Sequence, residues 1–236
     1  MNDDAPAVRL AATIIDVVRA ITRATPAPRG APFFYVDSDV WYDLDVLGSF
    51  CAHGIFRKYE FAIDLGCGFG GRARWLAARS GCRVLGIDPR LDVVRAATLL
   101  NRRGHATAQV GFRAGRLDAL PLRARVFTHA WMVVTAHNPW RPEILAEAFR
   151  VLRPGAAFAV QTVGDDAEAA ALCDALATEG FVQVERRAVV LTELPPSCRA
   201  AHDRVRAQWR DAAYDELLEK ATGECRGLQV FARRPA

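Results

Sequence analysis

Apolar residues recur along this chain with two alternating periods, one typical of helices and one typical of strands. Near the start, Ile14, Ile15, Val18 and Ile21 share one side of a helix, which predicts a helix over residues 8–24. A second helix is predicted over 38–52. The predicted strands then cover residues 61–64, 83–88, 109–114, 126–134, 156–163, 181–191 and 226–233, and the helices between them cover 70–79, 91–103, 142–152, 166–179 and 197–221.

This alternation indicates the fold class. Strands that alternate with helices form a doubly wound parallel sheet with helices on both faces. The helix at 197–221 separates the last two predicted strands and lets the final strand lie antiparallel beside its neighbour. We therefore expect a single α/β domain with a mostly parallel seven-stranded sheet, in which residues 1–57 form a helical cover and residues 58–236 form the core, with helix 197–221 inserted between its last two strands.

Composition narrows the class of protein. The chain has 236 residues and 51% of them are hydrophobic, so it can bury a sizeable core and does not have the composition of a disordered chain. No run reaches the roughly 18 apolar residues of a membrane span. The acidic start, MNDDAPAVRL, lacks the charged-then-apolar order of a signal peptide. We expect a cytoplasmic protein that does not enter a membrane.

Charge and cysteine content argue against two further classes. The formal charge is +4, and only Lys58 and Lys220 among the 31 basic residues are lysines, which leaves 29 arginines. These are scattered without a basic run, so we attribute the excess of arginine to composition and do not expect nucleic acid as a partner. The six cysteines lack the CxxC spacing of a metal site, and we expect free thiols and no metal. The sequence permits a homodimer but does not fix the oligomeric state.

The most informative segment is a glycine-rich turn between the first strand and the first helix of the core. It reads AIDLGCGFGG over residues 62–71, and its glycines let a ligand approach the main chain closely. Asp88 ends the next strand, 20 residues after Gly68, and this spacing suits a carboxylate that binds ribose hydroxyls. Ligands of open α/β sheets bind at this carboxyl edge.

Two classes of cofactor fit the glycines alone. Gly66, Gly68 and Gly71 satisfy GxGxxG, which is the pattern of a dinucleotide site. Asp64, however, lies two residues before the first glycine, where its charge would repel a pyrophosphate. A carboxylate there suits a ligand with an ammonium group, such as S-adenosylmethionine, which carries an amino acid, a sulfonium and a ribose.

Four motifs together resemble the class I S-adenosylmethionine-dependent methyltransferase family, in its small-molecule branch. AIDLGCGFGG resembles the family's first motif and VLGIDP its second. GRLDALPL (Gly115–Leu122) resembles the loop after the third strand, and EAFRVLRPGAAFAV (Glu147–Val160) resembles the segment that leads into the fifth. The resemblance covers about residues 58–164 and implies the family's Rossmann-like fold, with S-adenosyl-L-methionine as cofactor.

The resemblance implies a role for each part of the motif set. Asp64 and the main chain of Gly66 would hold the methionine amine, Gly68 and Gly70 would let the cofactor pass over the turn, and Asp88 would bind the ribose. The implied cofactor-binding residues are Asp64, Gly66, Cys67, Gly68, Gly70, Asp88, Pro89, Arg116, Leu117, Asp118 and Met132.

One departure from the family affects the adenine side. Family members often have an aspartate where this chain has Arg116, and a guanidinium cannot accept a hydrogen bond. Two readings stay open: Asp118 replaces the missing acceptor, or the main chain of Leu117 reads the adenine alone.

Candidate catalytic residues follow the fourth strand. His137 is either a general base, since an ordinary histidine titrates near neutral pH, or a residue that orients the substrate. Asn138 either contacts a polar substrate or starts a turn with Pro139. Tyr35 and Tyr42 of the N-terminal cover are the other candidates.

The expected reaction is methyl transfer to an N, O or C atom of a small metabolite. This small-molecule acceptor is also the expected binding partner of the protein. A sulfonium is a good leaving group, so the protein mainly has to align the acceptor with the methyl carbon and exclude water. Two alternatives remain: a cyclase or lyase that consumes S-adenosylmethionine and releases methylthioadenosine, and a binding module without catalysis. The product distinguishes the three.

Overall fold

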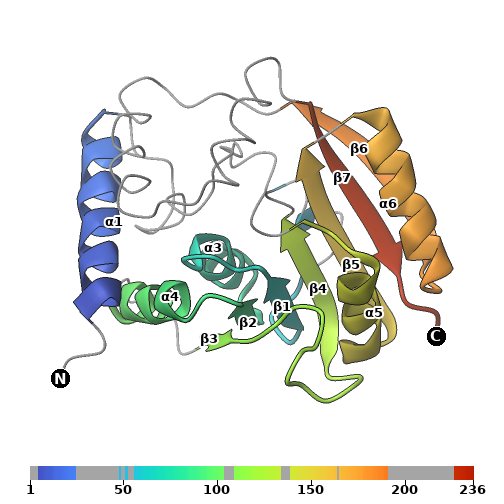
Figure 1. The fold of residues 1–236 in the computed structure, drawn as a ribbon, viewed down its shortest axis with the longest axis horizontal. Coiled ribbons are helices and arrows are strands. Elements are labelled where there is room, and N and C mark those ends of the chain that lie inside the picture. Colours follow the sequence, from blue (N-terminus) through green and yellow to red (C-terminus); the bar gives the residue numbers. More distant parts are fainter. Residues whose placement is uncertain are drawn as a thin grey trace.

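A seven-stranded sheet forms the centre of the molecule in this computed structural model (Figure 1). The structure describes residues 5–24, 48, 51–52, 56–103, 109–133, 139–163, 165–190 and 226–236. The strands lie in the order β3-β2-β1-β4-β5-β7-β6. Strand β1 pairs in parallel with β2 and β4, whereas β7 lies between β5 and β6 and is antiparallel to both. The predicted α/β fold with an antiparallel last strand is confirmed.

The elements follow the predicted order closely. The strands are β1 (Phe61–Leu65), β2 (Arg83–Asp88), β3 (Val110–Ala114), β4 (Phe127–Val133), β5 (Leu152–Val163), β6 (Val182–Val190) and β7 (Arg226–Arg233). The helices are α1 (Ala5–Ala24), α3 (Gly71–Ser80), α4 (Leu91–Arg103), α5 (Pro142–Val151) and α6 (Asp166–Thr178). The predicted helix at 197–221, and nearly all of that at 38–52, lie outside the described residues.

Strand β5 begins earlier than the sequence predicts. We expected the strand to begin at residue 156, because a proline and a glycine precede it. The strand instead begins at Leu152, which pairs with Phe127 of β4, and the register shifts before the next pair. This irregularity accommodates Pro154 and Gly155, whose φ is +75°, within the strand.

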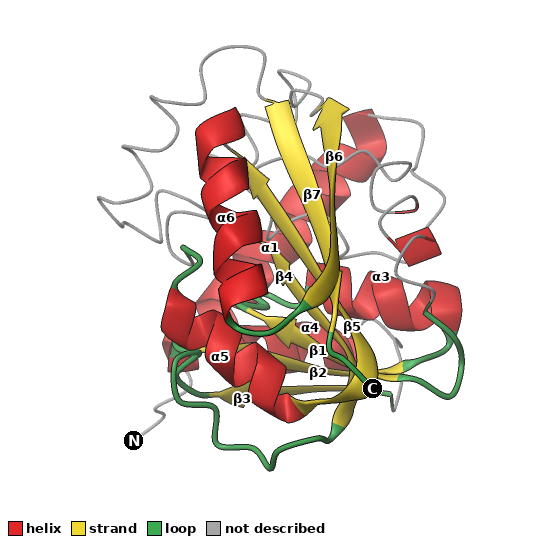
Figure 2. Ribbon diagram, turned by 90° about the vertical axis from the view of Figure 1, so that its right-hand side faces the viewer, coloured by secondary structure: helices red, strands yellow, loops and turns green. Residues whose placement is uncertain are grey.

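The two faces of the sheet carry different helices (Figure 2). Ile63 and Leu65 of β1 point into a core that contains α5 and α6. Ala62, one residue earlier on the same strand, points to the opposite face, where α3 packs. Because residues alternate between faces, Asp64 shares the α3 side with Ala62.

Helix α1 packs against α4 and not directly on the sheet (Figure 1). Its buried residues are Ala7, Leu10, Ala11 and Ile15, which recur at the spacing of one helical face. This part of the predicted N-terminal cover therefore lies beside α4, at the end of the sheet that β3 occupies.

Helix α5 holds the loop over residues 115–122 in place. A Glu147 carboxylate oxygen accepts the Leu120 N–H at 2.6 Å. The Arg150 guanidinium donates to the carbonyls of Leu120, at 3.1 Å, and Leu122, at 2.9 Å, and also bonds the Glu147 carboxylate. One acid and one base on the same helix thus fix the loop that was predicted to flank the adenine.

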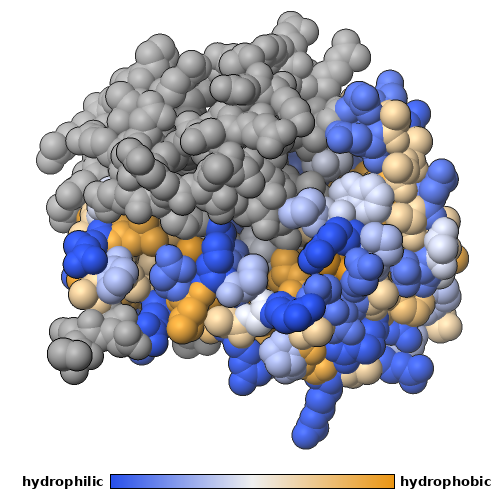
Figure 3. Space-filling model, in the orientation of Figure 1, coloured by the Kyte–Doolittle hydropathy of each residue, from blue (hydrophilic) through white to orange (hydrophobic). Residues whose placement is uncertain are grey.

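Hydrophilic and apolar side chains are mixed on the face of the molecule that Figure 3 draws. Among the described helices, none has both the length and the hydropathy needed to cross a membrane.

Gly86 provides a test of the packing of β2 against Phe112 of β3 and Cys67 of the glycine turn. A Cβ at this position would lie 2.6 Å from the Phe112 ring and 2.8 Å from the Cys67 side chain, whereas at Gly111 the nearest atom would be 3.8 Å away. Urea unfolding should show that Gly86→Ala lowers the free energy of unfolding by about 1–3 kcal/mol through overpacking. Gly111→Ala is the control and should be neutral or slightly stabilising. Equal losses in the two variants would contradict this packing.

Glu147 provides a test of the loop contact with α5. The hydrogen bond from Arg150 holds the pKa of Glu147 below its ordinary value of 4.5. A lowered folded-state pKa stabilises the protein above the unfolded value, and this contribution is lost as pH falls through the folded value. Glu147→Gln should therefore reduce the free energy of unfolding by about 1–2 kcal/mol at pH 7, with the difference from the native protein disappearing as pH falls below about 4.5.

Glu143→Gln, on the same helix but exposed, is the control for this test. It should change the free energy of unfolding by only a few tenths of a kcal/mol, the size of an exposed helix-dipole effect. A pH-independent loss in Glu147→Gln would show that its carboxylate is not what holds the loop.

Candidate functional site

The turn between β1 and α3 is built from glycines in the left-handed region. Gly66, Gly68 and Gly70 have φ of 73°, 53° and 77°, which residues with a Cβ rarely adopt. This alternation takes the chain from the end of β1 to the start of α3 within residues 66–70. The backbone conformation of the turn therefore favours glycine at these three positions, whether or not a ligand is bound.

The N–H groups of this turn bind the end of β2. The Gly66 and Cys67 N–H groups both donate to the Ile87 carbonyl, at 2.8 Å and 3.0 Å. The Gly68 N–H donates to the Asp88 carboxylate at 3.1 Å. The turn and the strand end that carries Asp88 are thus one hydrogen-bonded unit.

The two predicted carboxylates lie on one face of the sheet. Asp64 is in register with Gly86, and Asp88 follows Gly86 by two residues, so both side chains point to the α3 side. Each residue is only 2% exposed. The structure therefore brings together two buried acids at the carboxyl edge, on either side of the glycine turn.

Arg90 is part of this site and was not foreseen. Its main-chain N–H and its Nε both donate to one Asp88 oxygen at 3.0 Å, and its Nη2 donates to the other at 3.3 Å. With the Gly68 N–H, these bonds occupy the roughly four acceptor positions of the carboxylate. Sequence spacing offered no signal for this, because an arginine two residues after a strand is ordinarily a surface residue.

Two buried arginines in the first turn of α3 were also missed. Arg72 and Arg74 are 3% and 0% exposed. The Arg74 guanidinium donates to the Phe69 carbonyl at 2.8 Å, and that of Arg72 reaches the Gly66 carbonyl at 3.5 Å. Both arginines therefore reach back from α3 and donate hydrogen bonds to carbonyl groups of the glycine turn.

The loop after β3 reaches the same strand end. The Gly115 N–H donates to the Asp88 carbonyl at 3.1 Å, and the Leu117 side chain is buried in the core. Asp118 binds the Arg116 guanidinium at 2.9 Å and that of Arg141 at 3.4 Å. The hydrogen bond from Arg116 lowers the pKa of Asp118. The Asp118 carboxylate is thus engaged by two arginines.

The remaining predicted cofactor residues occupy varied positions. The Cys67 side chain packs against Gly86, and Met132 is fully buried in the core beneath α5, so their main chains are what can border a ligand. Pro89 is exposed. A Cβ at Gly70 would overlap the Phe112 ring, so close packing also requires this glycine.

The predicted catalytic residues cannot be placed. Tyr35, Tyr42, His137 and Asn138 lie outside the described residues. Within the described ranges, no three His, Cys, Asp or Glu side chains cluster where they could hold a metal ion.

A buried amide pair joins the carboxyl end of β5 to the first half of the antiparallel β7. Gln161 and Gln229 are 2% and 1% exposed, and the Gln229 amide donates to the Gln161 carbonyl oxygen at 3.1 Å. Gln161 is in register with Val133, near the end of β4. Because it lies two residues beyond Ala159, which aligns with Asp64 through Trp131, this amide faces the same side of the sheet as the two acids.

Comparison with known proteins agrees with this geometry. Residues 62–155 match the family described as "Methyltransferase domain". This region runs from β1 to β5 and includes the glycine turn, both acids and the loop after β3.

Curated relatives match over less than half of the chain. A sterol 24-C-methyltransferase of Kluyveromyces lactis is 27% identical over 105 residues, which is 44% of this chain and 28% of that protein. Squalene methyltransferase 2 of Botryococcus braunii is 39% identical over 101 residues, which is 41% of this chain and 26% of that protein. The chain thus spans little more than a quarter of the length of these relatives.

Solved structures share the fold. The cyclase SpnF superposes with a TM-score of 0.67 at 19% identity, over 95% of this chain and 93% of that one. A phosphoethanolamine N-methyltransferase of Haemonchus contortus, in complex with S-adenosyl-L-methionine, has a TM-score of 0.59 at 16% identity, over 80% and 52% of the two chains. Residues 62–155 thus match a methyltransferase domain, and the seven-stranded sheet has the Rossmann-like fold of solved methyltransferases.

Proposed function

We propose that this protein transfers a methyl group from S-adenosyl-L-methionine to an N, O or C atom of a small metabolite. The observation that carries the proposal is the pairing of two buried acids, Asp64 and Asp88, around a turn of three left-handed glycines. The family match over residues 62–155 supports the same cofactor.

The residues at the carboxyl edge fit this cofactor chemically. An Asp64 carboxylate complements an ammonium group, and an Asp88 carboxylate can accept hydrogen bonds from two ribose hydroxyls. The Leu117 main chain is the better candidate for the adenine edge, because the Asp118 carboxylate already binds Arg116 and Arg141. When bound, S-adenosylmethionine supplies a methyl group made electrophilic by the attached sulfonium.

The protein then has to position the acceptor in line with the methyl carbon and to exclude water from the site. The acceptor would lie over the ends of β4 and β5, where the buried Gln161–Gln229 pair offers polar atoms on the same face as the two acids. A hydroxyl or ammonium acceptor also requires a base to take its proton. His137, which follows β4 in the sequence, is the residue that we propose for this role, with Asn138, Tyr35 and Tyr42 as the other candidates.

The names of the relatives bear on the cofactor more than on the acceptor. The methyltransferase domain match over residues 62–155 is the part that carries the glycine turn and both acids, and the matches to the relatives are of similar length. Sterol and squalene methyltransferases therefore support S-adenosylmethionine as the methyl donor. The acceptor depends on the residues outside that region, and we propose only its class, a small metabolite.

A second candidate is a reaction on the same fold that is not methyl transfer. One observation raises this possibility: the neighbour that superposes over 95% of this chain is named a [4+2]-cyclase, so the fold is not confined to methyl transfer. In the version we consider, a nucleophile within the cofactor attacks its own aminobutyrate Cγ, the C–S bond breaks, and methylthioadenosine leaves with the electron pair.

The contacts of Asp88 give a test of cofactor binding. Since Arg90 occupies the acceptor positions that ribose hydroxyls would need, the hydroxyls should replace its guanidinium. By calorimetry, Asp88→Asn should weaken S-adenosylmethionine binding by about 1.5–3 kcal/mol, the value of hydrogen bonds to a charged group. Arg90→Gln leaves the carboxylate in place and should bind the cofactor at least as tightly as the native protein.

Circular dichroism of both variants controls for folding. Unchanged affinity in a folded Asp88→Asn variant would contradict the ribose assignment. An equal weakening in Arg90→Gln would show instead that the guanidinium belongs to the binding site.

Product analysis tests the reaction itself. The purified chain is incubated with S-adenosylmethionine labelled on its methyl group and a deproteinised metabolite extract, and the products are separated by chromatography. We expect S-adenosylhomocysteine and a labelled small molecule, both lost in Asp88→Asn. Methylthioadenosine formed without extract would support the cyclisation, and the absence of both products would contradict both reactions.

A further inference from the structure

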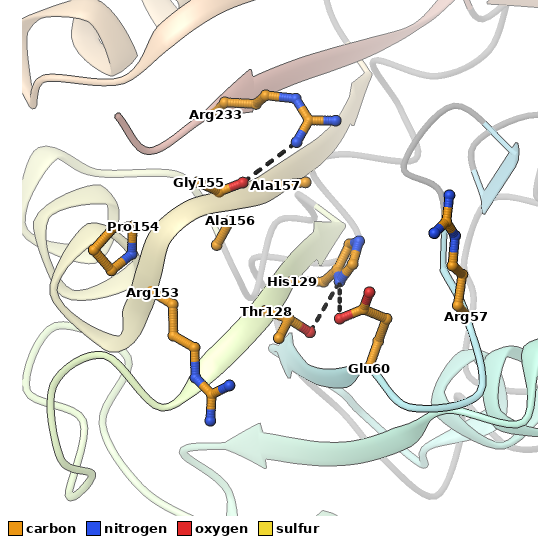
Figure 4. Close-up of a pocket in the computed structure, with 10 residues that line it drawn as sticks. All are labelled: Arg57, Glu60, Thr128, His129, Arg153, Pro154, Gly155, Ala156, Ala157 and Arg233. Carbon is orange, nitrogen blue, oxygen red and sulfur yellow. Dashed lines mark hydrogen bonds and ion pairs between the residues drawn. The ribbon is translucent and has the colours of Figure 1, made fainter. Parts of the chain in front are cut away.

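A cavity of about 330 Å³ opens at the amino edge of the sheet (Figure 4). It is formed where β4 and β5 begin and β7 ends, together with the segment that leads into β1. The described residues that line it are Arg57, Glu60, Thr128, His129, Arg153, Pro154, Gly155, Ala156, Ala157 and Arg233. Its size falls within the range of small-molecule sites, which begins near 300 Å³.

The hollow follows from one row of the sheet. His129, Ala157 and Arg233 are cross-strand neighbours on β4, β5 and β7, so their side chains share one face. The methyl group of Ala157 is too small to fill the space between an imidazole and a guanidinium. The base of the hollow is rigid, because the Thr128 hydroxyl bonds the main chain of Phe61 and lies 3.1 Å from the His129 ring nitrogen.

The charge around the cavity is unbalanced. Figure 4 shows Arg57, Arg153 and Arg233 around the cavity on three sides. Arg57 donates to the Tyr59 hydroxyl at 3.0 Å and Arg233 to the Gly155 carbonyl at 3.3 Å, and within the described residues none of the three forms an ion pair with a carboxylate. Glu60, the one acid among the described lining residues, lies 3.7 Å from the His129 ring nitrogen.

This arrangement differs from that of three other arginines in the described part of the chain. Arg90, Arg116 and Arg150 each bind a carboxylate directly. At the amino edge, three arginines, one acid and a histidine are the charged and titratable groups among the described residues around the cavity. The excess of positive charge attracts anions, and a guanidinium can form bidentate hydrogen bonds with a phosphate or a carboxylate.

The cavity cannot be the acceptor site of the proposed reaction. Glu60 precedes β1 and Asp64 lies near its end, and a five-residue strand is roughly 17 Å long. The two sites therefore occupy opposite edges of the same sheet.

We propose that this amino-edge cavity binds a small polyanion, a metabolite that carries phosphate or several carboxylate groups. Arg57, Arg153 and Arg233 bind its charges, and the surface of Ala157 sets the depth to which it enters. The modest volume of the cavity favours a small molecule over a macromolecule. The site is separate from the cofactor site and does not depend on the proposed reaction.

Calorimetry with two probes, pyrophosphate and citrate, tests the proposal. Each is titrated into the full chain at constant ionic strength. The Arg57→Gln/Arg153→Gln double variant should lose at least about tenfold in affinity, because two charge-assisted contacts disappear. The Arg102→Gln/Arg103→Gln double variant removes the same charge from two exposed residues at the end of α4 and should bind as the native protein does.

Ala157→Leu tests the location without changing any charge. It should fill the hollow and reduce the affinity to a similar extent, with circular dichroism confirming that each variant folds. Tighter binding of pyrophosphate would indicate a phosphate-bearing ligand, and tighter binding of citrate a carboxylate-bearing one. Saturable binding of neither probe, an equal loss in the Arg102/Arg103 control, or native affinity in Ala157→Leu would overturn the proposal.

Discussion

The carboxyl end of β2 is the point on which the geometry of the cofactor edge depends. Its last two residues receive main-chain N–H groups from both neighbouring loops: Gly66 and Cys67 on the Ile87 carbonyl, Gly68 on the Asp88 carboxylate, and Gly115 on the Asp88 carbonyl. Buried main-chain donors need partners, so these bonds fix both loops relative to the sheet. A single strand end thereby sets the distance between the glycine turn and the loop after β3.

This arrangement also explains why arginines are buried under the glycine turn. Several N–H groups of the turn donate to β2 and are therefore not available to the turn's own carbonyl groups. These carbonyls need donors from elsewhere. Arg72 and Arg74 provide them, although a cation near a helix N-terminus is opposed by the helix dipole and a buried charge must be desolvated. The hydrogen bonds to carbonyl oxygens offset these penalties, and the result is a turn supported from both sides.

The pattern of apolar residues predicted the sheet and its helices well, because periods of two and of about 3.6 reflect which side of each element is buried. It failed where local chemistry overrode the pattern, as at Pro154 and Gly155, which look like a turn but lie within β5. The motif spacing predicted that Asp64 and Asp88 would meet at one edge, since parallel strand ends are neighbours. It could not predict Arg90, because the bond of an arginine to a nearby acid depends on side-chain direction and not on spacing.

The sequence alone led us to attribute the excess of arginine to composition. In the structure, several of these arginines also have structural roles. Arg150 binds two carbonyls of the loop after β3 as well as Glu147, and the Arg234 guanidinium donates to the Leu152 carbonyl at 2.8 Å while lying over the Phe149 ring. A lysine has a single compact charged group and cannot hold several acceptors in a plane. Such arginines act as cross-links between elements, and their charge is used within the fold. Arg57 and Arg153 at the amino edge make no such carboxylate or cross-element contact among the described residues, so no partner there offsets the positive charge beside the cavity.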